Sequence, residues 1–299
     1  MFPIIPANSA TVSGNQEGIF GFGTTGSDTA VTNLVSNAGV VSTDVAGVGT
    51  ARDVPGACEY GGDKGIFGYG SPGVTTTNLV SNAGVVATDV AGVGTARYGV
   101  AACNYGGDRD KGIFGYGGHG VTSVTNLVSN AGIVSTDVAG VGTARAYPAA
   151  CEYGEDKGIF GYGSGSALSM TNLVSNAGVV ATDTTGVGTA RSTLAACGYG
   201  GDKGIFGYGD IHPSSPREAS MTNLVSNAGV VATDVAGVGT GRYGLAATQY
   251  GGDKGIFGYG EASPGVASMT NLVSNEGVVA SDVTGVGSAR RRLAACSFN

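Results

Sequence analysis

The chain has 299 residues, of which 57 are glycine and only 12% are charged, about half the usual charged share. No Gly-X-Y period is present, which excludes collagen, and a 41% share of hydrophobic residues is too high for a disordered chain. A formal net charge of −7 argues against a nucleic-acid partner, which would need a concentrated basic face.

The first seven residues have no basic n-region and no long apolar run, so they do not resemble a signal peptide. No stretch approaches the apolar length that a membrane-spanning helix needs. We therefore expect a soluble, unprocessed chain without membrane insertion. Such a chain would leave a cell by lysis or within a particle.

One string, Gly-Ile-Phe-Gly-(Tyr/Phe)-Gly, recurs six times along the chain. It begins at Gly18, Gly65, Gly112, Gly158, Gly204 and Gly255, so the period is 47, 47, 46, 46 and 51 residues. Self-similarity at this period is typical of a solenoid or a propeller. The secondary structure of one unit decides between them.

The fifth unit reads as two successive hairpins. Residues 194–199 and 204–209 are short apolar runs separated by the turn Gly-Gly-Asp-Lys, and residues 221–226 and 230–235 are separated by Asn-Ala-Gly. The last run is rich in β-branched residues, which suit a pleated sheet. No helical periodicity is present, so the pattern predicts four antiparallel strands per unit, as in a propeller blade.

The two ends of the chain complement each other. Residues 290–298 form a first strand without a following hairpin, while the first unit begins at Gly18 without a preceding first strand. We expect the last strand to join the first blade and close the ring. The sequence thus predicts an all-β fold, a six-bladed β-propeller forming one domain over residues 1–299. Its units 1 to 6 span 11–49 plus 289–299, 52–94, 97–142, 145–188, 191–239 and 242–287.

The run Arg-x-x-Leu-Ala-Ala-x-x-Tyr-Gly-Gly-Asp-Lys-Gly-Ile-Phe-Gly-Tyr-Gly resembles the kelch repeat, in which an arginine opens the inner strand and a glycine-ended hydrophobic strand follows. It departs from kelch in closing the second strand with Gly-Tyr-Gly instead of Gly-Gly, and in lacking the fourth-strand Trp. The run Thr-Asn-Leu-Val-Ser-Asn-x-Gly-Val-Val also resembles repeat proteins predicted in genomes of tailed phages of aquatic bacteria. These resemblances imply a kelch-like propeller and a virion protein assembled in the host cytoplasm.

Sequence differences between units fall in two places: the loop after the second strand and the residues after each repeat arginine. Because strand direction alternates, both places lie on one face of a propeller. Loops on a rigid scaffold commonly carry recognition, although drift at tolerant loop tips gives the same pattern. The candidate binding residues on this face are Tyr98, His119, Tyr147, Asp210, His212, Arg217, Glu218, Tyr243 and Arg291.

Each repeat arginine follows an aspartate by eight residues. A ring of guanidinium groups at a channel mouth could bind an anion. We favour a structural interpretation, in which each Asp/Arg pair links successive blades. The residues of these pairs are Asp44, Arg52, Asp89, Arg97, Asp137, Arg145, Asp183, Arg191, Asp234, Arg242, Asp282 and Arg290.

Five cysteines share one register of the first strand, with Thr248 in the sixth unit. Equivalent positions in neighbouring units of a ring lie too far apart for disulfide bonds. Zinc requires four converging ligands, which cysteines spread around a ring do not provide. We expect buried structural thiols and no metal or other cofactor. These residues are Cys58, Cys103, Cys151, Cys197 and Cys296.

A third repeated position, at the end of the second strand, is aromatic. Packing between blades is one explanation, and an aromatic platform for sugar rings or protein contacts is another. Burial of the rings distinguishes the two. The residues are Phe22, Tyr69, Tyr116, Tyr162, Tyr208 and Tyr259.

Catalysis finds little support, because the only histidines, His119 and His212, lie in variable loops of different units without a recurring partner. Two functions remain. One is a structural component of a phage virion, such as a capsid decoration or a tail or fibre protein, bound to other virion proteins. The alternative is a lectin-like module that binds a cell-surface glycan or receptor. An intracellular kelch adaptor is the weakest alternative, because such a protein would normally carry a further partner domain and almost every residue here belongs to a repeat unit.

Overall fold

The structure, a computed structural model, describes residues 16–118, 120–164 and 168–298. These residues form an all-β fold of six three-stranded antiparallel sheets and one two-stranded hairpin. Each unit supplies one three-stranded sheet, in which the strand that contains Gly-Ile-Phe-Gly is central.

The strands have these bounds. In units 1 to 3 they are β20 (Ala294–Phe298), β1 (Glu17–Gly21) and β2 (Thr32–Val35); β3 (Gly56–Tyr60), β4 (Lys64–Gly68) and β5 (Thr77–Val80); β6 (Ala101–Tyr105), β7 (Lys111–Gly115) and β8 (Thr125–Val128). In units 4 to 6 they are β9 (Ala149–Tyr153), β10 (Lys157–Gly163) and β11 (Leu168–Val174); β12 (Ala195–Tyr199), β13 (Lys203–Asp210) and β14 (Glu218–Val225); β15 (Ala246–Tyr250), β16 (Lys254–Gly258) and β19 (Thr270–Val273). The short hairpin pairs β17 (Glu261–Ala262) with β18 (Gly265–Val266), and η1 (Gly107–Arg109) is a single 3₁₀ turn.

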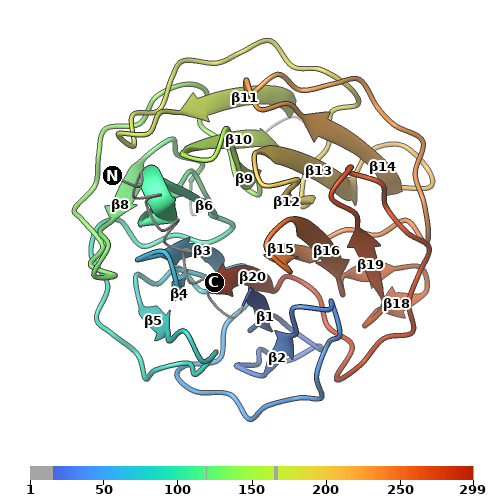
Figure 1. Cartoon of the computed structure of the whole chain (residues 1–299), viewed down its shortest axis with the longest axis horizontal. Coiled ribbons are helices and arrows are strands. Elements are labelled where there is room, and N and C mark those ends of the chain that lie inside the picture. The colour runs from blue at the N-terminus through green and yellow to red at the C-terminus, as the bar shows by residue number, and fades with distance from the viewer. Residues whose placement is uncertain (1–15, 119, 165–167, 299) are drawn as a thin grey trace, which may run out of the picture.

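The sheets are arranged around a common axis, with the first strand of each unit innermost (Figure 1). Contacts between first strands run β20–β3–β6–β9–β12–β15 and return to β20. β20 pairs with β1 in antiparallel register, with Cys296 opposite Ile19. The predicted pairing of the last strand with the first hairpin is therefore confirmed.

Glycines in the central strands allow neighbouring sheets to approach closely. A Cβ on Gly65 of β4 would lie 2.5 Å from Sγ of Cys296 in the adjacent sheet, and a Cβ on Gly68 would lie 2.8 Å from the ring of Phe114. Equivalent contacts recur at every interface between neighbouring sheets, with Thr248 taking the place of the cysteine opposite Gly18. The repeated glycine spacing is thus a packing requirement, since any side chain there would push the sheets apart.

The fourth strand predicted for each unit is not formed. In unit 1 the segment after the turn that follows β2 meets β2 only through isolated bridges at Val41 and Val45. Between these bridges the side-chain amide of Asn33 donates to the carbonyl of Ser42 (3.0 Å) and to the carboxylate of Asp44 (2.9 Å). This side chain replaces part of the backbone ladder and shifts the register by one residue, as in a β-bulge. The same arrangement recurs in the other five units.

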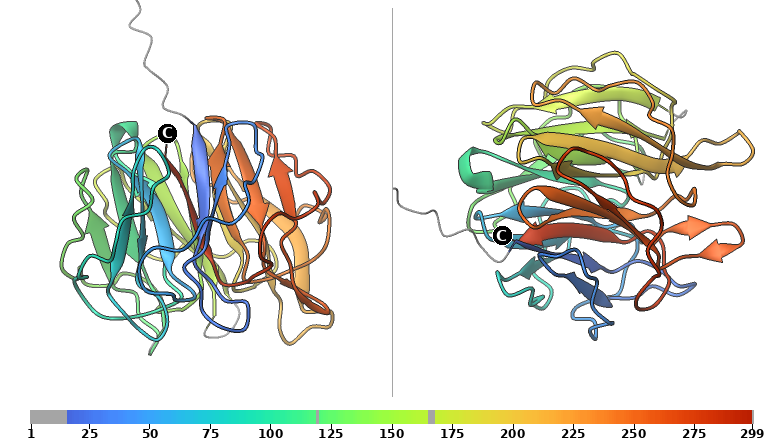
Figure 2. Two further views of the ribbon diagram at one scale, coloured as in Figure 1. Left: turned by 90° about the horizontal axis from the view of Figure 1, so that it is seen from below. Right: turned by 45° about the vertical axis from the view of Figure 1, so that its right-hand side comes forward.

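The ring of sheets has two distinct ends. The turns that join first to second strands lie at one end, which we call the turn end, together with η1 and the end of β20. The loops that join second to third strands lie at the other, the variable end; the loop after β13 and the β17–β18 hairpin project there (Figure 2). Within the described ranges, no helix has the length and apolar character that crossing a membrane requires.

Candidate functional site

The two variable parts of the sequence meet at the variable end. Residues that follow the repeat arginines form isolated antiparallel bridges with the loops after the second strands: Tyr98 with Gly118, Ala146 with Ser164, Ser192 with Asp210, Tyr243 with Glu261, and Arg291 with Thr24. Each bridge lies within one unit, and backbone hydrogen bonds such as those from the Gly209 N–H to the Arg242 carbonyl (2.9 Å) and from the Gly260 N–H to the Arg290 carbonyl (2.9 Å) join neighbouring units. The variable end is therefore one continuous surface.

A chain of polar contacts crosses units 5, 6 and 1 on this surface. Nε of Arg217 donates to the carboxylate of Asp210 (3.1 Å), and the Arg217 guanidinium lies 4.6 Å from the ring centroid of Tyr243. The Tyr243 hydroxyl is hydrogen-bonded to Glu261, which is ion-paired with Arg291. Four of these five residues are among those predicted from the sequence. Glu261 was missed because the sequence places it in a variable loop but does not show that it contacts Tyr243 and Arg291.

Units 3 and 4 contribute an aromatic pair. The rings of Tyr98 and Tyr147 are both half-buried and tilted by 47°, with centroids 6.2 Å apart. The Tyr147 ring covers Gly99, where a Cβ would lie 2.7 Å from it. Burial, with the neighbouring Tyr98, raises the pKa of Tyr147, so its hydroxyl stays neutral and can both donate and accept hydrogen bonds.

The remaining predicted residues are separate from these contacts or contribute little to them. His212 is exposed, and its backbone N–H donates to Asp210 (2.9 Å). Glu218 opens β14 and lines a groove of about 490 Å³ between the loop after β13 and residues 234–237. His119 lies outside the described residues.

Six backbone hydrogen bonds form a closed circle around the axis at the variable end. Each links the second residue after a repeat arginine to its equivalent in the next unit, over distances of 2.6–3.2 Å. The members, all with positive φ, are Val54, Gly99, Tyr147, Thr193, Gly244 and Arg292. The same six residues line a depression of about 70 Å³.

Arg292 projects beside this depression and was not singled out from the sequence. Its side chain is 42% exposed and lies 3.3 Å from the carboxylate of Asp53. The only sequence signal was the doublet of arginines after Arg290, which no other unit has.

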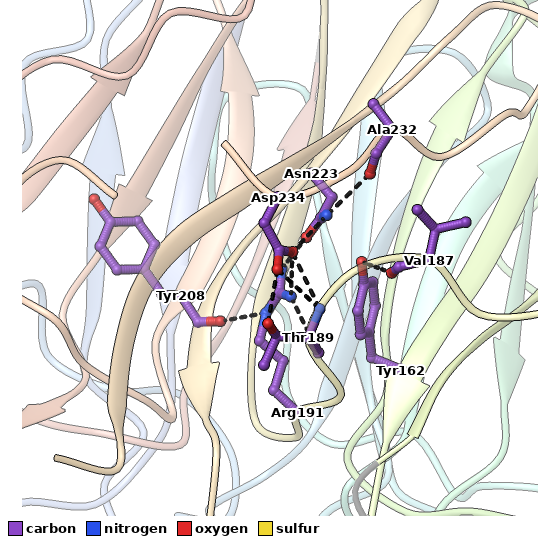
Figure 3. Close-up of polar contacts among 8 residues, drawn as sticks. All are labelled: Tyr162, Val187, Thr189, Arg191, Tyr208, Asn223, Ala232 and Asp234. Carbon is purple, nitrogen blue, oxygen red and sulfur yellow. Dashed lines mark hydrogen bonds and ion pairs between the residues drawn. The ribbon is translucent and has the colours of Figure 1, made fainter. Parts of the chain in front are cut away.

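The repeat arginines are buried and structural. Arg191 donates to Asn223 (2.6 Å), to the Tyr208 carbonyl (2.8 Å) and to the Thr189 carbonyl (3.0 Å), as Figure 3 shows. Its guanidinium also lies 4.4 Å from the ring centroid of Tyr162 in the preceding unit. Since these side chains are almost fully buried, they cannot form an open anion site.

The partner aspartate differs from the one that sequence spacing suggested. Arg191 lies 3.9 Å from Asp234, which follows it by 43 residues, and not beside Asp183. Segment 184–190 crosses to the next unit and carries the arginine away from Asp183, which approaches Arg145 (4.0 Å) instead. The arginine joins successive units by stacking on the aromatic ring of the preceding one, and the aspartate holds the crossing segment through Thr189 (2.7 Å).

The repeated aromatic residues at the ends of the second strands pack between sheets. All six have no exposed surface, and the five tyrosine hydroxyls donate to backbone carbonyls at 3.1–3.2 Å. An aromatic platform at these positions is therefore excluded. Among the described residues of the variable end, the partly exposed aromatic side chains are Tyr98, Tyr147 and Tyr243.

The cysteines are buried free thiols, as expected. Burial raises the pKa of Cys197 to about 12, which leaves its thiol protonated and unreactive at neutral pH. Among the residues that the structure describes, no cluster of His, Cys, Asp or Glu could hold a metal ion.

At the turn end, Arg109 extends into the mouth of the axial channel. It donates to Gln249 of unit 6 (2.7 Å) and to the Gly201 carbonyl of unit 5 (3.2 Å), and lies 3.0 Å from the carboxylate of Glu152 in unit 4. Sequence reasoning missed it, although the turn Gly-Gly-Asp-Arg-Asp-Lys of unit 3 is two residues longer than the common one.

The chain matches no known protein-family model and no curated protein. The geometry of the variable end is therefore the main guide to what the chain does.

Proposed function

We propose that the chain is a six-bladed, kelch-like β-propeller that acts by binding and not by catalysis, as a recognition component of a phage virion. The ring of sheets around one axis and the pairing of β20 with β1 support the propeller architecture. The resemblance of the repeats to phage-encoded repeat proteins supports the virion assignment.

The polar chain from Asp210 to Arg291 is the observation that carries the binding role. It joins side chains of three units, although every one of them lies at a position that differs between units. Drift alone would leave these side chains unconnected, whereas a binding surface requires them to be held relative to one another.

The virion assignment is tested by locating the protein in particles. Antibodies against the purified chain should label intact particles of the phage that encodes it, and mass spectrometry of gradient-purified particles should detect the chain at constant stoichiometry. Its absence from purified particles would overturn the virion assignment and leave the binding role to be tested separately.

A lectin-like module that is independent of a virion is the second candidate. It is favoured by the half-buried Tyr147, whose ring lines a depression, and by the neighbouring Tyr98, since both combine a flat apolar ring with a hydroxyl group. A glycan array probed with the isolated chain distinguishes the candidates, because a lectin binds without other particle proteins and a purely structural component does not.

A further inference from the structure

The arginines outside the repeat positions, apart from Arg109, are concentrated at the variable end, where Arg292 lines the depression. Apart from the six repeat arginines and Arg109, the chain has three: Arg217, Arg291 and Arg292. All three lie at the variable end with exposed side-chain fractions of 44%, 31% and 42%. The lysines, by contrast, all follow the aspartate of a first turn at the opposite end and pair with it.

Each of these three arginines is already paired with a carboxylate. Arg217 pairs with Asp210, Arg291 with Glu261, and Arg292 with Asp53. Together these three pairs carry no net charge, and Asp28, which interacts with both Asp53 and Arg292, adds a further carboxylate. An anionic ligand would have to displace a carboxylate from each arginine and approach a chain of net charge −7.

The inner wall of the depression is apolar. Its lining includes Pro55, Pro148, Leu194, Leu245 and Leu293, which are buried, and the half-buried Tyr147. The depression thus combines a half-buried aromatic ring with a rim where Arg292 pairs with Asp53. Arg292 and Tyr147 line it together, so both kinds of surface are available to one ligand.

A sugar without ionised groups has the matching chemistry. Its hydroxyl groups both donate and accept hydrogen bonds, so two neighbouring hydroxyls can accept from a guanidinium and donate to the carboxylate paired with it. Its C–H face is apolar and stacks on a tyrosine ring, which has few rotamers to lose.

We propose that the depression and its rim bind a neutral saccharide with adjacent hydroxyl groups, stacked on Tyr98 and Tyr147 and hydrogen-bonded to the Arg292–Asp53 pair. This inference rests on the proposed binding role of the variable end. It goes further in naming the ligand class, the subsite and the residues that contact the sugar.

The test is saturation-transfer NMR of the full chain with neutral oligosaccharides chosen from an array, and with their sialylated and sulfated counterparts. The neutral sugars should show transfer from tyrosine protons. Affinity should change less than about twofold between 50 and 500 mM salt, since no net charge is paired on binding. Binding confined to sialylated or sulfated sugars, or a steep salt dependence, would overturn the proposal.

Variants locate the site. Tyr98→Ala and Arg292→Met should each weaken binding about tenfold or more, as expected for a central contact. Lys157→Ala, at the turn end, is the matched control and should bind normally. Thermal unfolding of each variant shows whether it is folded, and Tyr98→Phe should retain binding because it keeps the stacking ring.

The outcomes separate this inference from the proposed function. If replacement of residues 211–217 by a short Gly-Ser turn abolishes binding while Tyr98→Ala and Arg292→Met leave it unchanged, the saccharide site is elsewhere on the variable end. The inference then fails and the recognition role stands. If no glycan binds at all, the inference also fails, and the presence of the chain in particles decides the proposed function.

Discussion

The guanidinium of Arg109 lies 3.0 Å from the carboxylate of Glu152, and both groups are largely buried at the axis of the ring. The charge of Glu152, despite the opposing effect of burial, raises the pKa of Arg109. Because Arg109 also contacts units 5 and 6, this single side chain holds four units together where the first strands converge.

Replacing Arg109 by alanine should therefore destabilise the ring. The substitution leaves the Glu152 carboxylate buried without its cation, and breaking a buried pair in this way costs about 3 kcal/mol. Chemical denaturation monitored by circular dichroism measures the loss. Lys111→Ala removes an exposed pair in the same turn and should cost less than about 1 kcal/mol; equal losses in the two variants would contradict the assigned role.

The repeat arginines should not tolerate lysine. Arg191→Lys keeps the charge but cannot reach Asn223, the Tyr208 carbonyl and the Thr189 carbonyl together, and it loses the planar stack on Tyr162. We expect a loss of about 2–4 kcal/mol in the free energy of unfolding, since buried acceptors are left unpaired. An unfolding free energy within experimental error of the parent would show that the network is not needed.

The contact between Gly65 and Cys296 predicts a compensating pair of substitutions. Gly65→Ala forces a Cβ to within 2.5 Å of the sulfur and should cost about 1–3 kcal/mol through overpacking. Cys296→Ala removes that sulfur, so the double variant should be more stable than Gly65→Ala alone. A double-mutant cycle checks this, and strictly additive losses would mean that the two residues do not touch.

Acid should weaken the ring through its six equivalent aspartates. Burial alone would raise the pKa of Asp234, but hydrogen bonds from Thr189 and Asn223 and the charge of Arg191 hold it below its ordinary value, and the other five behave likewise. Their contribution is therefore complete above about pH 5 and is lost as the pH falls through the lowered folded-state pKa values. Unfolding free energies measured from pH 7 to pH 3 should fall steeply at the acid end. Asp234→Asn should reduce that slope, and a parent curve that stays flat to pH 3 would contradict the account.

Local patterns in the sequence were enough to predict the sheets and the pairing of β20 with β1. Each hairpin is determined by residues that are close together in the sequence, such as the turn Gly-Gly-Asp-Lys and the β-branched runs beside it. The six repeats show the same pattern. The burial of the cysteines followed from the same register.

Features that depend on distant residues were predicted poorly. The prediction of a fourth strand was wrong because the Asn33 side-chain amide donates hydrogen bonds to the neighbouring segment in place of part of the backbone ladder. Strand propensity describes single residues and does not include such a contact. The predicted partner of Arg191, Asp183, was wrong because it was chosen for its closeness in the sequence. The segment between the two residues crosses to the next unit, where Arg191 lies near Asp234. Arg109 and Arg292 were missed because their partners lie in other units.

A comparison of the two ends tests the central claim, that this ring of sheets binds through its variable end. Glycan-array and phage-host cell binding would be measured for the parent chain, for Tyr98→Ala with Arg217→Ala at the variable end, and for Lys64→Ala with Lys157→Ala at the turn end. The account predicts that only the first pair of substitutions reduces binding. Binding that survives those substitutions but is lost with the lysine changes would place recognition at the turn end and contradict the account.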